Sequence, residues 1–172
     1  MKKIITLAVV TALSSLVAIS PANAQESKSS GVSVRAGLFF PSATNASNVG
    51  KNWFGFGLEY KLGDLNMGAQ KGSNASYSVS IDMFSKGDFR NAPLLLNYIC
   101  RTENIYYKAG AGVSFLKYPV GGGTESKTDF GYQLAIGYDF NKGNMPYFAE
   151  VVWFGSSKSE VNGLALMGGV RF

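Results

Sequence analysis

The stretch Phe130–Phe140, with the sequence FGYQLAIGYDF, alternates between two kinds of side chain at every position. Its even-numbered positions carry large apolar or aromatic residues, whereas the odd-numbered positions carry Gly131, Gln133, Ala135, Gly137 and Asp139. A period of two places successive side chains on opposite faces of a β-strand. The stretch therefore predicts a strand with one bulky apolar face and one small or polar face.

The same alternation recurs along the rest of the chain after residue 30. We predict eight strands, over residues 31–40, 53–62, 76–84, 93–101, 105–117, 130–140, 146–154 and 161–172. No segment after the N-terminal region shows the 3.6-residue period of an amphipathic helix or 18 consecutive apolar residues, so no helical span is predicted there.

The composition of the two faces decides which of them is inside. One face of each strand carries the large residues, and the other carries mainly Gly, Ala and Ser with isolated charges. The interior of an eight-stranded barrel has room only for side chains, so the small face fits inside and the bulky face must meet lipid. Large aromatic residues also cluster near strand ends, as interfacial girdles do. The fold class predicted for 31–172 is an all-β, eight-stranded antiparallel up-and-down transmembrane β-barrel.

The first 24 residues have the pattern of a secretory signal peptide. Lys2 and Lys3 precede an apolar run, and Pro21 to Ala24 supply a small-residue end, so cleavage is expected between Ala24 and Gln25. Residues 25–30 then form a short N-terminal segment before the barrel. We expect an exported protein located in the outer membrane.

Composition excludes several classes of chemistry. The chain has no His and one Cys, Cys100, which rules out catalytic sites that need His and any Cys-rich metal site. We expect no enzyme activity, no cofactor and no bound metal. The formal net charge of +5 falls to +3 when Lys2 and Lys3 are removed, which is too small to favour a nucleic-acid partner.

The small faces also carry charges that the alternation directs into the barrel. Isolated charges in so narrow an interior are costly, so we expect them to pair with one another. The predicted interior charge network consists of Arg35, Glu59, Lys61, Asp82, Lys108, Asp139, Glu150 and Arg171. Asn97 and Gln133 have the same phase. These residues predict a plug, and a gated polar path for ions or small solutes is the alternative.

The links between strands set the orientation. Residues 101–104 and 141–144 are short and turn-like, whereas 41–52 and 118–129 are long and rich in small polar residues. Because both ends of an even-stranded barrel lie in the periplasm, the longer links are outer loops. The link 63–75 is long for a periplasmic turn. The outer loops carry charges of both signs, which indicates either a solvated rim or contact with lipopolysaccharide phosphates or an unknown extracellular ligand.

Two further stretches carry a resemblance to a known family. Ala92-Pro-Leu-Leu-Leu-Asn is followed by Tyr107-Lys-Ala-Gly-Ala-Gly-Val, and the chain ends with Gly169-Val-Arg-Phe172. With the signal peptide and the alternating segments, they resemble the small outer-membrane β-barrel superfamily of the OmpA/OmpX and opacity-protein type, without a peptidoglycan-binding domain. The resemblance implies that the barrel assembly machinery reads the last strand through Phe172, Val170, Gly168 and Leu166.

The sequence thus favours a small outer-membrane barrel with a structural or surface-interaction role, carried by its outer loops. A narrow pore for ions or small solutes is the second hypothesis. A soluble lipid-binding barrel, with its apolar face turned inward, is the third.

Overall fold

The computed structural model describes residues 31–65, 73–140, 145–157 and 161–172, and it contains eight strands and one short helix. In chain order these are β1 (Val32–Pro41), α2 (Thr44–Val49), β2 (Trp53–Leu65), β3 (Ser73–Lys86), β4 (Phe89–Thr102), β5 (Ile105–Val120), β6 (Gly123–Asp139), β7 (Tyr147–Ser156) and β8 (Gly163–Arg171). No helix of the described ranges is long and apolar enough to cross a membrane. The signal peptide, the 25–30 segment and the 141–144 turn predicted from the sequence lie outside these ranges.

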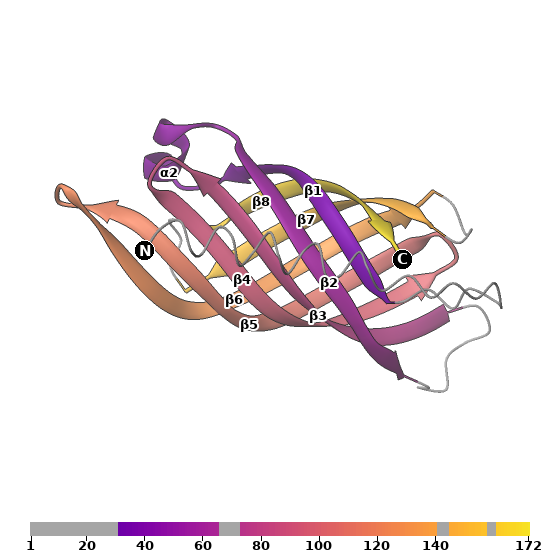
Figure 1. Ribbon diagram of the computed structural model, residues 1–172. Coiled ribbons are helices and arrows are strands. Elements are labelled where there is room, and N and C mark those ends of the chain that lie inside the picture. Colours follow the sequence, from indigo (N-terminus) through magenta and orange to yellow (C-terminus); the bar gives the residue numbers. More distant parts are fainter. Residues whose placement is uncertain (1–30, 66–72, 141–144, 158–160) are drawn as a thin grey trace, which may run out of the picture.

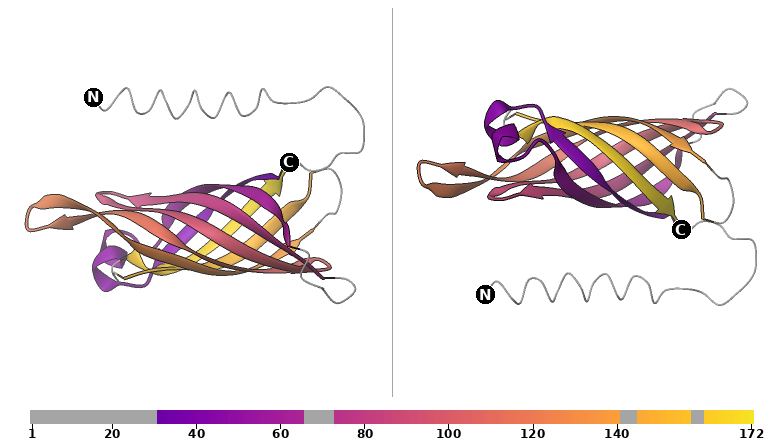
Figure 2. Two further views of the ribbon diagram at one scale, coloured as in Figure 1. Left: turned by 90° about the horizontal axis from the view of Figure 1, so that it is seen from below. Right: turned by 90° about the horizontal axis from the view of Figure 1, so that it is seen from above.

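The eight strands form a closed barrel in which each strand pairs with its sequence neighbours and β1 closes on β8 (Figure 1). All pairs are antiparallel. The predicted eight-stranded antiparallel up-and-down barrel is therefore confirmed. The Gly31 amide donates to the Phe172 carbonyl, 3.0 Å away, so these two residues meet at one end of the barrel, here called the terminus end. The opposite end, where residues 118–129 of β5 and β6 project as a two-stranded ribbon, is called the ribbon end (Figure 2).

The strands on one side of the barrel are longer than the alternation predicts. The link between β3 and β4 shrinks to the turn Gly87–Asp88, and that between β5 and β6 to Gly121–Gly122. All three glycines have positive φ, at 57°, 52° and 90°, which glycine adopts without strain. Most of the predicted outer loop 118–129 is thus strand. Both faces are solvent-exposed there, so no burial imposes an alternating pattern.

The long link 63–75 is also partly strand. β2 continues to Leu65 and β3 begins at Ser73, with a register shift between Lys61 and Gly63. The predicted turn at 101–104 narrows to two residues between Thr102 and Ile105.

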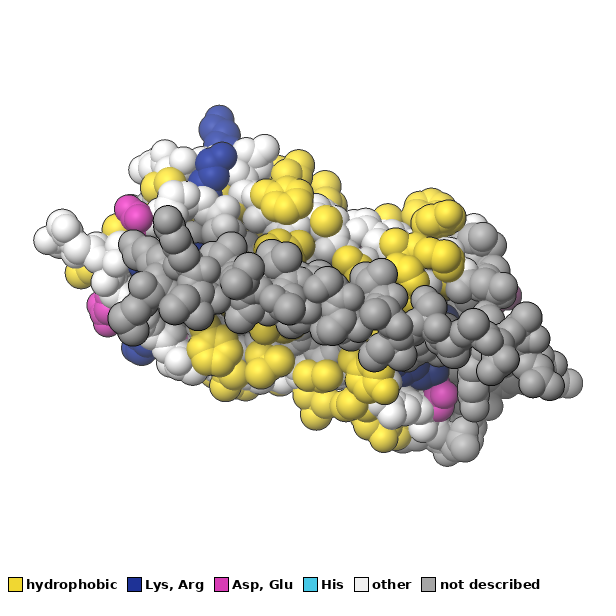
Figure 3. Space-filling model, in the orientation of Figure 1, with side chains coloured by type: hydrophobic (Ala, Val, Ile, Leu, Met, Phe, Trp, Pro, Cys, Tyr) yellow, Lys and Arg dark blue, Asp and Glu magenta, His cyan; other side chains and the backbone are white. Residues whose placement is uncertain are grey.

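The outer surface of the barrel carries an apolar belt. Its outward positions are exposed or half-buried and hold only apolar, aromatic or Gly residues: even numbers in 32–40, 54–62, 92–100, 130–140 and 164–172, and odd numbers in 77–83, 105–115 and 147–153. Cys100, Leu166, Gly168, Val170 and Phe172 belong to this belt. Figure 3 shows hydrophobic side chains between the two ends of the face it presents, with charged side chains toward those ends.

Inward glycines make room for large inward side chains on the neighbouring strand. A Cβ atom added to Gly55 would collide with the ring of Phe84, and one added to Gly137 would collide with Tyr106. The small residues of the inner face therefore belong to a tightly packed interior.

Candidate functional site

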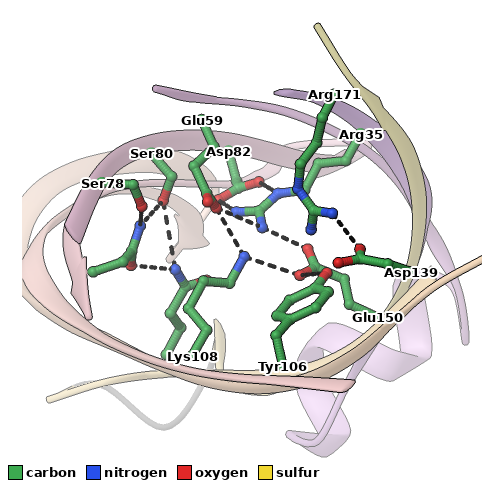
Figure 4. Close-up of polar contacts among 12 residues, drawn as sticks. Arg35, Glu59, Ser78, Ser80, Asp82, Tyr106, Lys108, Asp139, Glu150 and Arg171 are labelled. Atoms are coloured by element: carbon green, nitrogen blue, oxygen red, sulfur yellow. Dashed lines mark hydrogen bonds and ion pairs between the residues drawn. The ribbon is translucent and has the colours of Figure 1, made fainter. Parts of the chain in front are cut away.

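The middle of the barrel interior holds a buried charge network of Arg35, Glu59, Asp82, Lys108 and Glu150 (Figure 4). Arg35 donates to both oxygens of Asp82, with Nε–Oδ1 at 2.8 Å and Nη2–Oδ2 at 2.6 Å. Its Nη1 also donates to Glu150 Oε1 at 2.5 Å and to Glu59 Oε2 at 3.4 Å. One guanidinium thus contacts three carboxylates from three different strands.

Lys108 completes the network from the opposite wall. Its Nζ lies 2.9 Å from Glu59 Oε2 and 2.9 Å from Glu150 Oε2, and the Tyr106 hydroxyl donates to the same Glu150 oxygen at 2.9 Å. The side chains of Arg35, Asp82, Lys108 and Glu150 are at most 2% exposed and that of Glu59 is 10% exposed. Buried charges of this kind are stable only when paired and hydrogen-bonded.

The barrel register brings Arg35 and Asp82 together across an intervening glycine. Arg35 of β1 pairs with Gly57 of β2, and Gly57 pairs with Asp82 of β3. A Cβ atom on Gly57 would collide with the Asp82 carboxylate. The guanidinium therefore reaches Asp82 because the strand between them has no side chain at that position.

A second charged group lies toward the terminus end. Asp139 accepts hydrogen bonds from Arg101 Nε, at 3.0 Å, and from Arg171 Nη1. Both guanidinium groups lie over the ring of Tyr106, 5.3 and 4.9 Å from its centroid. Tyr106 thus separates this group, with two cations and one carboxylate, from the network, with two cations and three carboxylates. The group near the terminus end therefore has one excess positive charge and the network has one excess negative charge. These two charges attract each other across the Tyr106 ring.

Seven of the eight predicted network residues lie in these two groups, and Lys61 does not. Its Nζ lies 2.6 Å from Asp64, and the two side chains are 40% and 62% exposed. Lys61 borders the register shift near the terminus end of β2, and its side chain reaches solvent there. Its predicted interior position is therefore wrong. Arg101 and Tyr106 were missing from the predicted set, although their inward phase on β4 and β5 indicated them.

Neutral polar side chains lie beside the charge network in the barrel interior (Figure 4). Asn97 Nδ2 donates to Ser78 Oγ at 3.3 Å and to Ser80 Oγ at 3.0 Å. Gln133 Nε2 donates to Asn97 Oδ1 at 2.5 Å. These four residues are at most 1% exposed, so the polar filling continues beyond the ion pairs.

An aromatic plug of Phe39, Trp53, Phe84, Phe89 and Phe154 fills the ribbon end of the interior. The ring centroids of Phe39 and Phe84 are 4.9 Å apart, and those of Phe84 and Phe154 are 4.8 Å apart. Trp53 packs on Phe39 and Phe89 at 5.3 and 5.6 Å. All five residues are at most 4% exposed. The alternation predicts charges and small residues inside and does not indicate this plug.

Residues of two connections at the ribbon end are held over the plug. The short helix α2 packs its fully buried Ala46 on the aromatic plug. Backbone and side chain of Ser42 both donate to the Asn162 carbonyl, at 2.8 and 3.0 Å. Asn91 Nδ2 donates to the Val161 carbonyl at 3.2 Å. These contacts hold the β1–β2 connection and residues 161–162 against the barrel.

The β5–β6 ribbon, residues 118–129, differs from these connections because it projects beyond the rest of the barrel (Figure 2). Residues 119–128 are exposed on both faces. An open hollow of about 460 Å³ lies beside the ribbon tip, lined by Asp88 and residues 119–124. In the described ranges, no group of three or more His, Cys, Asp or Glu side chains is arranged to hold a metal ion.

The closed barrel, its apolar belt and its filled interior define a small eight-stranded β-barrel of the transmembrane type. At the level of the fold, the resemblance inferred from the sequence is confirmed. The particular proteins to which the chain is similar come from solved structures. No protein-family model and no curated protein matches it.

Two solved structures similar to this chain are of Ail from Yersinia pestis. One is the outer membrane protein Ail in a phospholipid bilayer nanodisc, with 18% identity, a TM-score of 0.48 and coverage of 82% of this chain and 98% of that chain. The other is Ail, the attachment invasion locus protein, in complex with the heparin analogue sucrose octasulfate, with 16% identity, a TM-score of 0.42 and coverage of 81% and 96%. The fold assignment rests on the strand register of the chain itself.

Proposed function

We propose that the protein is an integral β-barrel of a bacterial outer membrane that acts through the surface at its ribbon end. The observation that carries this proposal is the apolar belt, whose outward positions hold no charged residue on any of the eight strands. Such a belt is stable only in contact with lipid or detergent. A soluble lipid-binding barrel would need the opposite arrangement, with apolar side chains lining an open interior.

Export through a signal peptide cleaved after Ala24 and assembly through the last strand are parts of this proposal. Fractionation of cells is expected to recover the mature chain in the outer membrane, as a folded form that migrates differently on gels after heating. A Phe172→Ser variant should give less of the heat-modifiable form. Recovery of the wild type as a soluble monomer would refute the membrane location.

The orientation has a direct test in a Cys100→Ser background. Val120→Cys, exposed beside the ribbon tip, should react with a membrane-impermeant maleimide on intact cells. Thr102→Cys, exposed in the turn region at the terminus end, serves as the matched control and should react only after the outer membrane is permeabilised. Labelling of Thr102→Cys on intact cells would show that the orientation is inverted.

Lipopolysaccharide is the membrane partner that we propose for the outward rim. Arg90 and Lys117 pair directly across β4 and β5, one step beyond the Ala92–Phe115 pair of the belt. Like charges at directly opposed positions repel, and a bound phosphate would relieve the repulsion. Lipopolysaccharide should raise the unfolding temperature of the wild type, and the Arg90→Ser/Lys117→Ser double variant should lose this increase while folding normally.

The filled interior supports a structural role over the second hypothesis, a narrow pore. Ion pairs, neutral polar side chains and the aromatic plug together fill the interior. In planar bilayers we therefore expect little steady conductance from the purified protein. Reproducible single-channel steps, with an ion selectivity that changes in Glu59→Ala, would favour the pore.

A further inference from the structure

Strand β6 pairs with β5 along one edge and with β7 along the other, and it extends beyond the end of β7. It begins at Gly123, and its pairing with β5 runs without a shift from Val120–Gly123 to Ile105–Tyr138. Its pairing with β7 begins only at Gly131–Ser156. Among the described residues, positions 123–129 therefore have a strand partner on one side only. An edge of this kind can pair with another strand.

The hydrogen-bonding phase shows which residues face the open edge. Asp139 donates its amide to Asn104, on the β5 side, whereas Phe140 donates to Tyr147, on the β7 side. Because consecutive residues of a strand alternate in this direction, the even-numbered residues bond away from β5. The backbone groups of Thr124, Ser126 and Thr128 are thus directed to the open edge.

The other edge of the ribbon is blocked. β4–β5 pairing ends at Arg90–Lys117. By the same alternation, Pro119 is the next β5 residue whose backbone groups are directed away from β6. Proline has no backbone N–H and cannot donate to a ladder. The ribbon therefore offers one edge for pairing, and that edge belongs to β6.

We propose that the open β6 edge pairs in antiparallel fashion with the same edge of a second copy of this chain, centred on Ser126. This inference rests on the proposed role of the ribbon-end surface and names its partner. Residue 126 is the middle of the open run 123–129. In this register Ser126 meets Ser126 of the second copy, and Thr124 meets Thr128 twice. Each of these pairs exchanges two backbone hydrogen bonds.

The side-chain charges select this register. Between the hydrogen-bonded pairs, Glu125 lies opposite Lys127 of the second copy, and symmetry repeats the pair. These positions bring side chains closest together, and opposite charges there stabilise the ladder. A shift of two residues places Glu125 against Glu125 in one direction and Lys127 against Lys127 in the other. The allowed neighbouring registers are therefore disfavoured by like-charge repulsion.

The symmetry also fixes how the two barrels lie. A self-complementary antiparallel pair is related by a two-fold axis perpendicular to the ribbon. Because the ribbon projects along the long direction of the barrel (Figures 1 and 2), the two barrels point in opposite directions with their ribbon ends facing. The pairing therefore joins molecules from two facing membranes, or two molecules free in detergent.

Charge exchange gives the decisive test, using full-length mature protein in detergent and in vesicles. Wild type should sediment as a dimer at high protein concentration, and vesicles carrying it should clump. Glu125→Lys alone and Lys127→Glu alone should each lose the dimer, because each creates two like-charge contacts. A mixture of the two variants should regain it, since every contact then joins opposite charges. The Glu125→Lys/Lys127→Glu double variant should also dimerise.

Disulfide cross-linking in a Cys100→Ser background tests the register itself. Ser126→Cys should cross-link to itself, because hydrogen-bonded partners lie about 5.5 Å apart at Cα, within disulfide range. Thr124→Cys and Thr128→Cys should not cross-link alone, since identical positions are four residues, or roughly 14 Å, apart. A mixture of these two variants should cross-link.

A wild type that stays monomeric at every concentration, or single charge variants that dimerise as well as wild type, would overturn this proposal. A different result would refute the proposed surface role: no labelling of the ribbon tip by impermeant maleimide on intact cells. The two failures are therefore distinguishable.

Discussion

The charge network and the aromatic plug occupy the same barrel interior and are both almost fully buried, but different forces hold them. In the network, Arg35 depends on named partners on β2, β3 and β7. In the plug, Phe84 packs between Phe39 and Phe154 without a polar contact. Removing one partner strands a charge in the network, whereas it leaves only a space in the plug. The network should therefore be sensitive to chemistry and the plug to volume.

The largest expected effect is at Arg35, the centre of the network. Arg35→Met keeps much of the side-chain volume but leaves Asp82, Glu59 and Glu150 facing a single cation. We expect a loss of roughly 3–5 kcal/mol in the free energy of unfolding, the usual cost of breaking a buried ion pair. Urea unfolding in lipid vesicles, followed by tryptophan fluorescence, measures this loss.

The double variant Arg35→Met/Asp82→Leu sharpens this prediction. It removes the bidentate pair together, so it should be more stable than Arg35→Met alone. Lys51→Met, at an exposed position, is the control and should leave the unfolding free energy nearly unchanged. A double variant less stable than the single would mean that Arg35 acts mainly through packing.

The next effect compares the inside with the outside at adjacent positions of β6. Leu134 is 57% exposed in the apolar belt, and Leu134→Arg should cost roughly 2–4 kcal/mol in a bilayer. Ala135 packs inward against the buried hydrophobic cluster that includes the plug, and Ala135→Leu should cost roughly 1–3 kcal/mol by overpacking. Unfolding free energies in vesicles measure both, and a harmless Arg at position 134 would show that this surface does not meet lipid.

Glu59 should have a smaller effect than Arg35. Its side chain is the most exposed of the network, and its contact with Arg35 is the longest ion pair there. Glu59→Ala leaves two cations facing two carboxylates, so the remaining network is balanced. We expect a loss of roughly 1.5–3 kcal/mol, the value of a hydrogen bond to a charged group. A loss as large as that of Arg35→Met would imply that Lys108 depends on Glu59 alone.

The smallest effect belongs to the plug. Phe84→Leu and Phe154→Leu keep apolar contacts and should each cost below about 1.5 kcal/mol. Their double variant should be no more stable than either single, in contrast to the Arg35 and Asp82 pair. Trp53 reports directly on the plug in a Trp153→Phe background. A rescue of one Phe variant by the other would break the comparison between the two regions.

Much of the barrel was predictable because lipid and interior impose opposite demands on alternate positions. The stretch Phe130–Phe140 predicted both faces of its strand. The prediction lost accuracy where that contrast ends, as at Lys61 beside its register shift and in the 118–129 ribbon, which is exposed on both faces.

The aromatic plug shows a second limit. The alternation placed Phe39 on the inner face, but isolated large residues among Gly, Ala and Ser did not reveal that five strands deliver their rings to one level. The same holds for Arg101 and Tyr106, whose phase was known and whose partners were not.

By itself, the sequence determined the strands, their two faces and the apolar surface, since these follow from a local period of two. The tertiary structure alone decided which inward residues meet. Arg35 reaches Asp82 across Gly57, and it also reaches Glu150 on β7. Both contacts depend on barrel closure and strand register, which fix the height of every strand. The free edge of β6 likewise depends on where its pairing with β7 ends, and the sequence of β6 does not show that position.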